Sequence, residues 1–224
     1  DLSSDAGLLL FKEFLFKLGF DKLLKKCFKT NDSASSRIHT DDKNLLQMIY
    51  QIFGAYFKDD CADELTNDPV LKAILGKDVL ASQPTMSRFF NRMDDDTLRQ
   101  FYDIMRQMRK IVYFIQTPEI MLLDLDSTLL DTYGEQEGEA FNFHYQAHGY
   151  HPLLCYDGLT GDLIKIQIRK GSDYSSTGVT EFLQPILDEF LNDYPTMQLM
   201  LRGDSGFATP DLYSQCETNG TRFA

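Results

Sequence analysis

An apolar segment that carries two acidic side chains places the strongest constraint on how this chain can fold. In residues 120–128, Asp124 and Asp126 lie within a run of Ile, Met and Leu that predicts a buried β-strand. Residues two apart on a strand point to the same face, so both carboxylates would lie together. Burying carboxylates is costly unless a partner or a metal compensates. The segment therefore predicts a strand whose acids serve a site.

A second apolar run ends on an acid further along the chain. Residues 197–203 predict another strand, and Asp204 follows it within a Gly-Asp-Ser-Gly turn. Each feature has an ordinary explanation, because Asp204 could belong to a plain turn and Asp124 and Asp126 could be solvated acids on an edge strand. Two strands that deliver acids to one place, however, are typical of a divalent-metal site for phosphoryl transfer.

Net charge divides the chain into two halves. Residues 1–116 hold 17 Lys and Arg against 17 Asp and Glu, whereas residues 117–224 hold 5 against 17 and carry the whole net charge of −12. An acidic half repels nucleic acid, because phosphate binding depends on Lys and Arg. A nucleic-acid substrate would thus need metal ions or the basic side chains of the first half.

The sequence shows no sign of a membrane-spanning or secreted protein. No apolar run approaches the roughly 20 residues of a membrane span, and no signal peptide is visible. The four cysteines are far apart and form no CxxC pair, which favours reduced thiols in the cytoplasm. The chain begins at Asp1 without an initiator Met, so we expect a fragment of a longer protein.

Hydrophobic periodicity changes from 3.6 to 2 after Pro118. We expect helices over residues 7–29 with a break at Gly19, 41–58, a short stretch after Pro69, 82–93 and 97–115. Strands follow at 119–126, 151–157, 162–168 and 197–203, with helices at 177–192 and 210–218 and a strand beginning at 221. This order predicts an α+β or α/β fold with two domains: a helical region at 1–116 and, at 117–224, a ribonuclease H-like mixed β-sheet that is incomplete at its C-terminus. Only in that topology could Asp126 and Asp204 meet.

Basic and histidine side chains supply further candidates. Lys165, Arg169 and Lys170 cluster at the end of a predicted strand, and Arg88 and Arg92 flank two phenylalanines. Charge runs are usually solvated surface, but these five are the candidates for contact with a DNA backbone. Among the histidines, His144 and His148 would share one face only on a helix, where they could bind zinc; the Tyr- and Gly-rich segment instead favours a polar loop near the acids.

Several separated motifs resemble the DDE transposases of bacterial insertion sequences, specifically the insertion sequence 1380 family with a DDE domain of group 1. They are the segments at residues 123–128, 133–138, 142–145, 149–154, 160–161, 168–171, 201–207 and 210–213, with 5–10 and 82–88 in the helical half. The resemblance implies a ribonuclease H-like core in which Mg²⁺ or Mn²⁺ is held by two Asp and one Glu. It assigns the metal and the catalysis to Asp126 and Asp204, with Asp124 as an additional metal candidate.

The resemblance also implies partners and a cellular location. A transposase cleaves and transfers DNA strands at the terminal inverted repeats of its element and inserts them into target DNA. We expect it to act as a homodimer in the bacterial cytoplasm, at the nucleoid and not at a membrane. The third acid has no counterpart here, because Glu217 falls too early, and we expect the fragment to lack a complete active site.

Two alternatives stay open at this point. The stretch Asp124-Leu-Asp-Ser-Thr also resembles the DxDxT motif of haloacid-dehalogenase-like phosphatases, in which Asp124 would be the nucleophile and Asp126 the acid/base. Those enzymes follow the motif with alternating strand–helix units, whereas a β-meander is predicted here. The other alternative is a non-catalytic, DNA-binding remnant of a transposase.

Overall fold

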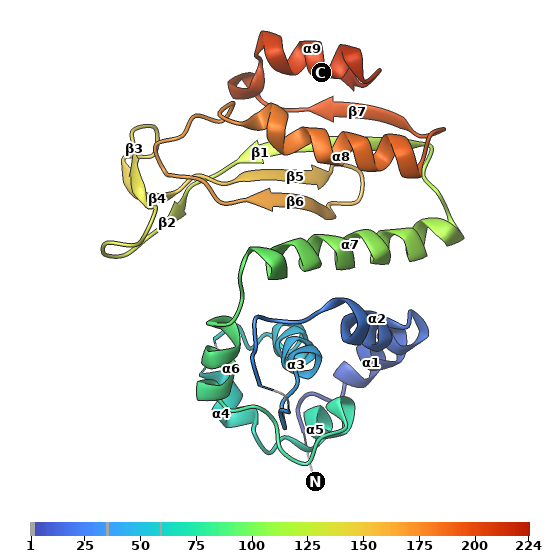
Figure 1. Ribbon diagram of the computed structural model, residues 1–224, viewed down its shortest axis with the longest axis vertical. Coiled ribbons are helices and arrows are strands. Elements are labelled where there is room, and N and C mark those ends of the chain that lie inside the picture. Colours follow the sequence, from blue (N-terminus) through green and yellow to red (C-terminus); the bar gives the residue numbers. More distant parts are fainter. Residues whose placement is uncertain (1–2, 35, 59) are drawn as a thin grey trace. The chain divides into compact units, whose positions relative to one another are not determined.

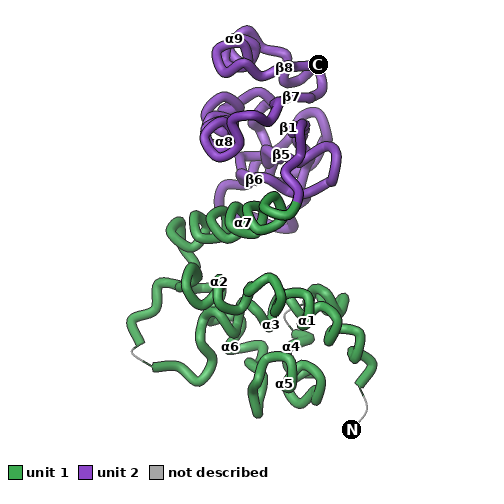
Figure 2. The backbone as a smooth tube through the Cα atoms, turned by 90° about the vertical axis from the view of Figure 1, so that its right-hand side faces the viewer, with its two compact units in different colours: residues 1–115 green, residues 116–224 purple. Residues whose placement is uncertain are grey.

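The computed structural model describes residues 3–34, 36–58 and 60–224, and the chain divides into two compact units, Asp1–Ile115 and Gln116–Ala224 (Figure 2). In the described part of the first unit the elements are all helices. They are α1 (Leu8–Lys17), α2 (Phe20–Cys27), α3 (Asp41–Phe53), α4 (Cys61–Leu65), α5 (Pro69–Leu75), α6 (Gln83–Phe90) and α7 (Asp95–Ile115). No helix in the described ranges is long and apolar enough to cross a bilayer.

Local signals explain where several of these helices begin and end. Gly19 and Gly76 adopt left-handed backbone conformations, at φ of 71° and 63°, and end the helical runs that precede them. Asp68 caps α5 by accepting a hydrogen bond from the Leu71 amide at 2.8 Å. The third helix stops at Phe53, before the predicted residue 58, because Gly54 follows and Ala55 turns to a φ of 65°.

The helical unit has its own core, which includes Leu24, Leu45, Tyr50, Leu71 and Phe89, all at most 2% exposed. A buried amide also links two of its segments. Gln47 on α3 donates to the Ala81 carbonyl at 2.8 Å and accepts from the Ala81 amide at 2.9 Å. Both polar groups are thereby satisfied inside the core.

The second unit is built on a five-stranded mixed sheet in the order β6-β5-β1-β7-β8 (Figure 1). Its elements are β1 (Ile120–Ser127), β5 (Leu153–Asp157), β6 (Leu163–Gln167), α8 (Val179–Asp193), β7 (Gln198–Arg202), α9 (Pro210–Thr218) and β8 (Arg222–Phe223). The strands β5 and β6 form an antiparallel hairpin beside β1, whereas β7 and β8 run parallel to it. This is the ribonuclease H-like arrangement, and the predicted fold class is confirmed.

The same topology decides against the phosphatase hypothesis. The DxDxT motif of those enzymes is followed by strand–helix units, but here β1 is followed by antiparallel strands. Helix α8 makes the crossover to β7 and runs across the sheet (Figure 1). Its apolar side is buried through Phe182, Leu183 and Phe190.

A small second sheet was not predicted from the sequence. It contains β2 (Leu130–Asp131), β3 (Ala140–Asn142) and β4 (Ala147–Tyr150), in the order β2-β4-β3. His148 lies on β4 and His144 lies in the turn before it, so these two residues do not share a helical face. His148 pairs instead with Glu139, at 2.8 Å.

Candidate active site

Asp126 stands near the end of the central strand. Its backbone still pairs with Leu154 of β5, and its side chain is on the exposed side of the alternation that buries Leu123 and Leu125. One carboxylate oxygen, Oδ1, accepts a hydrogen bond from the Ser127 amide at 2.7 Å. The sheet and this bond together fix the carboxylate at the strand end.

Asp204 is held by a comparable local bond. It follows β7 by two residues and begins the short 3-10 turn Ser205–Phe207, where its Oδ1 accepts from the Gly206 amide at 2.7 Å. A Cβ at Gly206 would lie only 2.9 Å from that oxygen, which explains the glycine at this position. In both acids, therefore, a backbone amide binds one carboxylate oxygen. The same bond sets the direction in which the other oxygen points.

The register of the two parallel strands relates these acids to each other. Asp124 of β1 pairs with Arg202 of β7, and both strands run in the same direction from that pair. Asp126 and Asp204 each follow the pair by two residues. Neighbouring strands lie roughly 4.8 Å apart. Both acids thus belong to the same end of two adjacent strands.

Asp124 is committed to an ion pair. The Arg202 guanidinium donates to both of its carboxylate oxygens, with Nε at 2.9 Å from Oδ1. The hydrogen bonds and charge of Arg202 hold the pKa of Asp124 below its ordinary value, despite partial burial. A carboxylate neutralised in this way is a poor metal ligand and a poor nucleophile. Asp124 as an additional metal ligand stays a prediction, and its ion pair with Arg202 counts against it.

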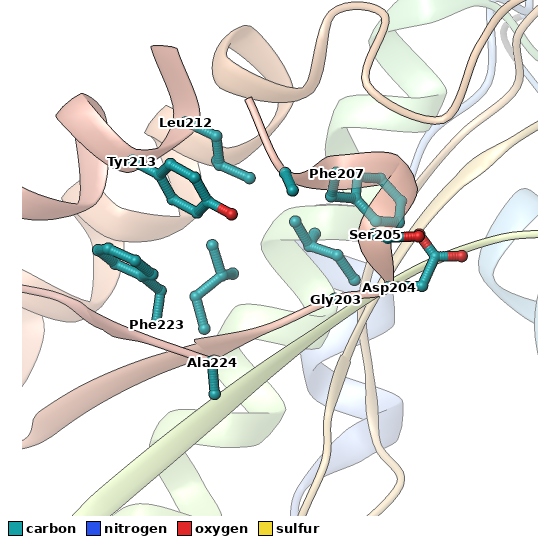
Figure 3. A pocket seen from close by; sticks show the side chains of 11 residues that line it. Gly203, Asp204, Ser205, Phe207, Leu212, Tyr213, Phe223 and Ala224 are labelled. Carbon is teal, nitrogen blue, oxygen red and sulfur yellow. The ribbon is translucent and has the colours of Figure 1, made fainter. Parts of the chain in front are cut away.

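Two cavities border Asp204. An apolar pocket of about 220 Å³ is lined by Leu125, Leu201, Tyr213 and Phe223, and Figure 3 shows the Asp204 carboxylate turned away from those rings. The other cavity is a polar cleft of about 380 Å³. It is lined by Ser127, Asn142, His144, Tyr145, His151, Asp173, Ser175, Asp204 and Ser205, among others. The predicted polar segment around the histidines thus reaches the acid-bearing end of the sheet.

Arg169 is buried next to this cleft, at 8% exposure. Its guanidinium donates to the main-chain carbonyls of His151, Tyr174, Ser175 and Thr177 and to the Ser127 hydroxyl. Burial lowers the pKa of Arg169 from its ordinary value, and Asp173 acts in the opposite direction. The donor groups of Arg169 bond within the fold, which counts against a contact with a DNA backbone, and that contact stays a prediction.

Two other basic candidates are also engaged within the fold. Lys165 donates to the Phe182 carbonyl at 2.8 Å, and its half-buried amine lies 4.7 Å from the Phe182 ring centroid. The Arg92 side chain, 18% exposed, bonds to Asp41 at 3.0 Å and to the Thr30 hydroxyl at 3.1 Å. Both side chains bond within the fold, which counts against a contact with DNA, and that contact stays a prediction for each.

Arg88 and Lys170 differ from these residues because both are exposed. Arg88 lies near the end of α6, where its side chain makes one long hydrogen bond, at 3.3 Å, to Thr85. Lys170 follows the buried Arg169 directly, yet it lies on the surface. Of the five basic candidates, these two keep a side chain that DNA could reach.

The donor set at the sheet end suits a hard divalent cation. Asp126 and Asp204 offer carboxylate oxygens, which Mg²⁺ and Mn²⁺ prefer. Across the described ranges, no three His, Cys, Asp or Glu side chains are gathered closely enough to hold a metal ion. Asp126 and Asp204 are therefore candidates for a metal site, and the described part of the chain gathers no histidine cluster of the kind that would hold zinc.

Comparisons with known proteins show the family of this chain. No curated protein matches the sequence. Among solved structures, a Mos1 transposase paired-end complex with left transposon end is 11% identical, with 99% of this chain and 78% of that chain covered and a TM-score of 0.33. The Mos1 mariner paired end complex with Mn is 10% identical, with the same coverage and TM-score. The family model described as transposase DDE domain group 1 matches residues 1–224. The chain therefore belongs to the DDE transposases, enzymes that cleave and transfer DNA strands.

Proposed function

We propose that this chain supplies Asp126 and Asp204 as two acids of a Mg²⁺- or Mn²⁺-dependent site for DNA strand cleavage and transfer at insertion-sequence ends. DDE transposases depend on divalent metal ions, so the family defines the chemistry and the question is which residues perform it. The observation that carries the proposal is the parallel register of β1 and β7, in which both acids follow the Asp124–Arg202 pair by two residues.

Each residue at this edge has a distinct task under the proposal. A bound divalent metal ion would activate the attacking oxygen and stabilise the leaving one in an in-line displacement at phosphorus. Asp126 and Asp204 would hold that ion, each through the carboxylate oxygen that the backbone does not anchor. The positive charge of Arg202 balances the negative charge of Asp124, which reduces the net negative charge that a DNA phosphate meets near the site.

Within the described residues no three metal-binding side chains are gathered, and we infer that a third acid, a Glu, completes the site from elsewhere. We further propose that the parent protein belongs to the insertion sequence 1380 family. It would act as a homodimer on terminal inverted repeats and target DNA in the bacterial cytoplasm. The paired-end arrangement named for the Mos1 complexes is compatible with that assembly.

A Mn²⁺ titration of the chain, followed by water-proton relaxation, tests the metal assignment. We expect Asp126→Asn and Asp204→Asn each to weaken Mn²⁺ binding by at least about 10-fold, because each removes a ligand charge. Asp162→Asn is the matched control, since it removes one exposed carboxylate at the β5–β6 turn, beside Asp157 rather than at the acid-bearing strand end. Equal binding by Asp126→Asn and the control would show that Asp126 is not a ligand.

DNA contacts are proposed for the helical unit, because residues 117–224 carry the whole negative excess. Arg88 and Arg92 make a matched pair, one exposed and the other bonded to Asp41 and Thr30. We expect Arg88→Ala to weaken duplex binding and lower the slope of log affinity against log salt by about 0.9. Arg92→Ala is expected to lower the free energy of unfolding by about 1–3 kcal/mol instead. Salt titrations of duplex binding give the slopes. If Arg92→Ala folds and lowers the slope more than Arg88→Ala does, the assignment of the DNA contact to Arg88 is contradicted.

A further inference from the structure

Arg169 is an unusual side chain to bury in this fold. It is 8% exposed, and its hydrogen-bond partners are main-chain carbonyls and a hydroxyl rather than a carboxylate. Burying a cation without an ionic partner costs free energy, and apolar side chains often replace buried ionic groups without loss of stability. Packing alone therefore does not explain a guanidinium at this position.

The guanidinium joins the segments that meet at the end of β1. Nη2 donates to the Ser127 hydroxyl at 3.1 Å, Nε donates to the His151 carbonyl at 2.9 Å, and Nη1 donates to the Thr177 carbonyl at 2.6 Å. These partners belong to the end of β1, the short link between β4 and β5, and the loop before α8. A planar fork with several fixed donors can hold such segments in one geometry, whereas a lysine ammonium cannot.

Ser127 transmits this constraint to the catalytic acid. Its hydroxyl accepts from Arg169 and donates to the Pro152 carbonyl at 2.8 Å. Its amide donates to Asp126 Oδ1 at 2.7 Å. Arg169 is thus connected to the Asp126 carboxylate through a single residue whose main chain and side chain are both hydrogen-bonded.

We propose that Arg169 is a positioning residue that orients the Asp126 carboxylate through Ser127. The inference rests on the proposed function, in which Asp126 holds a divalent metal ion. Arg169 itself touches neither the ion nor DNA. Groups that orient metal ligands in this way commonly change metal affinity by about 10–100-fold when they are removed.

Substitutions at Ser127 test the connection with little change to the fold. We expect Ser127→Ala to weaken Mn²⁺ binding by about 10-fold, while the thermal unfolding midpoint moves by no more than about 4 °C. Ser127→Thr keeps the hydroxyl and should bind Mn²⁺ as the unmodified chain does. Thr160→Val is the matched control, because it removes a hydroxyl that donates to Asp157 and accepts from the Asp162 amide in the turn at the other end of β5. Arg169→Lys keeps the charge but loses the fork, and should resemble Ser127→Ala.

The outcomes separate this proposal from the one on which it rests. Normal Mn²⁺ binding by Ser127→Ala, together with a loss in Asp126→Asn, would overturn the positioning role and leave the metal site standing. Normal binding by Asp126→Asn would overturn both. Should Arg169→Lys not fold, the contrast between Ser127→Ala and Ser127→Thr decides the question alone.

Discussion

Strand cleavage by the full-length transposase is expected to fall by about three orders of magnitude or more when Asp126 or Asp204 is replaced by Asn. Loss of a metal ligand removes several kcal/mol of transition-state stabilisation, and each ~1.4 kcal/mol is a factor of ten in rate. Both acids end adjacent parallel strands, so either substitution should have a similar effect. The measurement is nicking of a supercoiled plasmid that carries the element's own ends, with Mg²⁺ or Mn²⁺.

Asp124→Asn is the informative comparison, because it removes a carboxylate two residues from Asp126 on the same strand. Its carboxylate is bonded to Arg202, so we expect it to retain a substantial part of the cleavage activity. Circular dichroism of all three variants would show that they fold alike. A greater loss in Asp124→Asn than in Asp126→Asn would reverse the assigned roles.

Gly171→Ala is expected to destabilise the catalytic unit by about 2–3 kcal/mol. A Cβ at this position would lie 2.2 Å from the Ala140 carbonyl oxygen and 2.4 Å from that of Gly149. Both obstacles are main-chain atoms, so no side chain can move aside to make room. The backbone would have to shift where the small sheet meets the segment after Arg169, and urea unfolding of the variant measures the cost.

Gly7→Ala is the control for that substitution. A Cβ at Gly7 meets no atom within 4 Å, and the backbone φ of −58° suits alanine. We therefore expect unchanged or slightly greater stability. Equal stability of the two alanine variants would mean that the segment around Gly171 adjusts freely, contrary to the packing described above.

The parts of the fold that were predicted correctly are those with strong local patterns. The strand β1, the β5–β6 hairpin and helix α8 each have a clear period and turn residues, so their identity is encoded within a few neighbouring positions. The small sheet could not be predicted, because its strands are two to four residues long and depend on pairing between separate segments.

At the candidate site, the sequence suggests the acids but does not show their hydrogen-bond partners. Arg169 and Lys170 are adjacent and both basic, yet one is buried and the other exposed. Sequence alone treats both as surface charges, because it does not show that the chain turns the carbonyls of His151 and of residues 174–177 toward Arg169. Similarly, Asp124 pairs with Arg202 because of the register between β1 and β7. That register is visible in the structure and not in the sequence.

The Asp124–Arg202 pair joins positions 78 residues apart, and this separation has a consequence for protein synthesis. A nascent chain cannot form the acid-bearing edge until β7 has left the ribosome and docked beside β1. Long-range parallel pairing of this kind is slow, because loop closure precedes any compensating contact. A ribosome-bound chain that stops before β7 would therefore carry the helical unit without this edge. On the DNA contacts proposed above for that unit, DNA binding would then precede DNA cleavage.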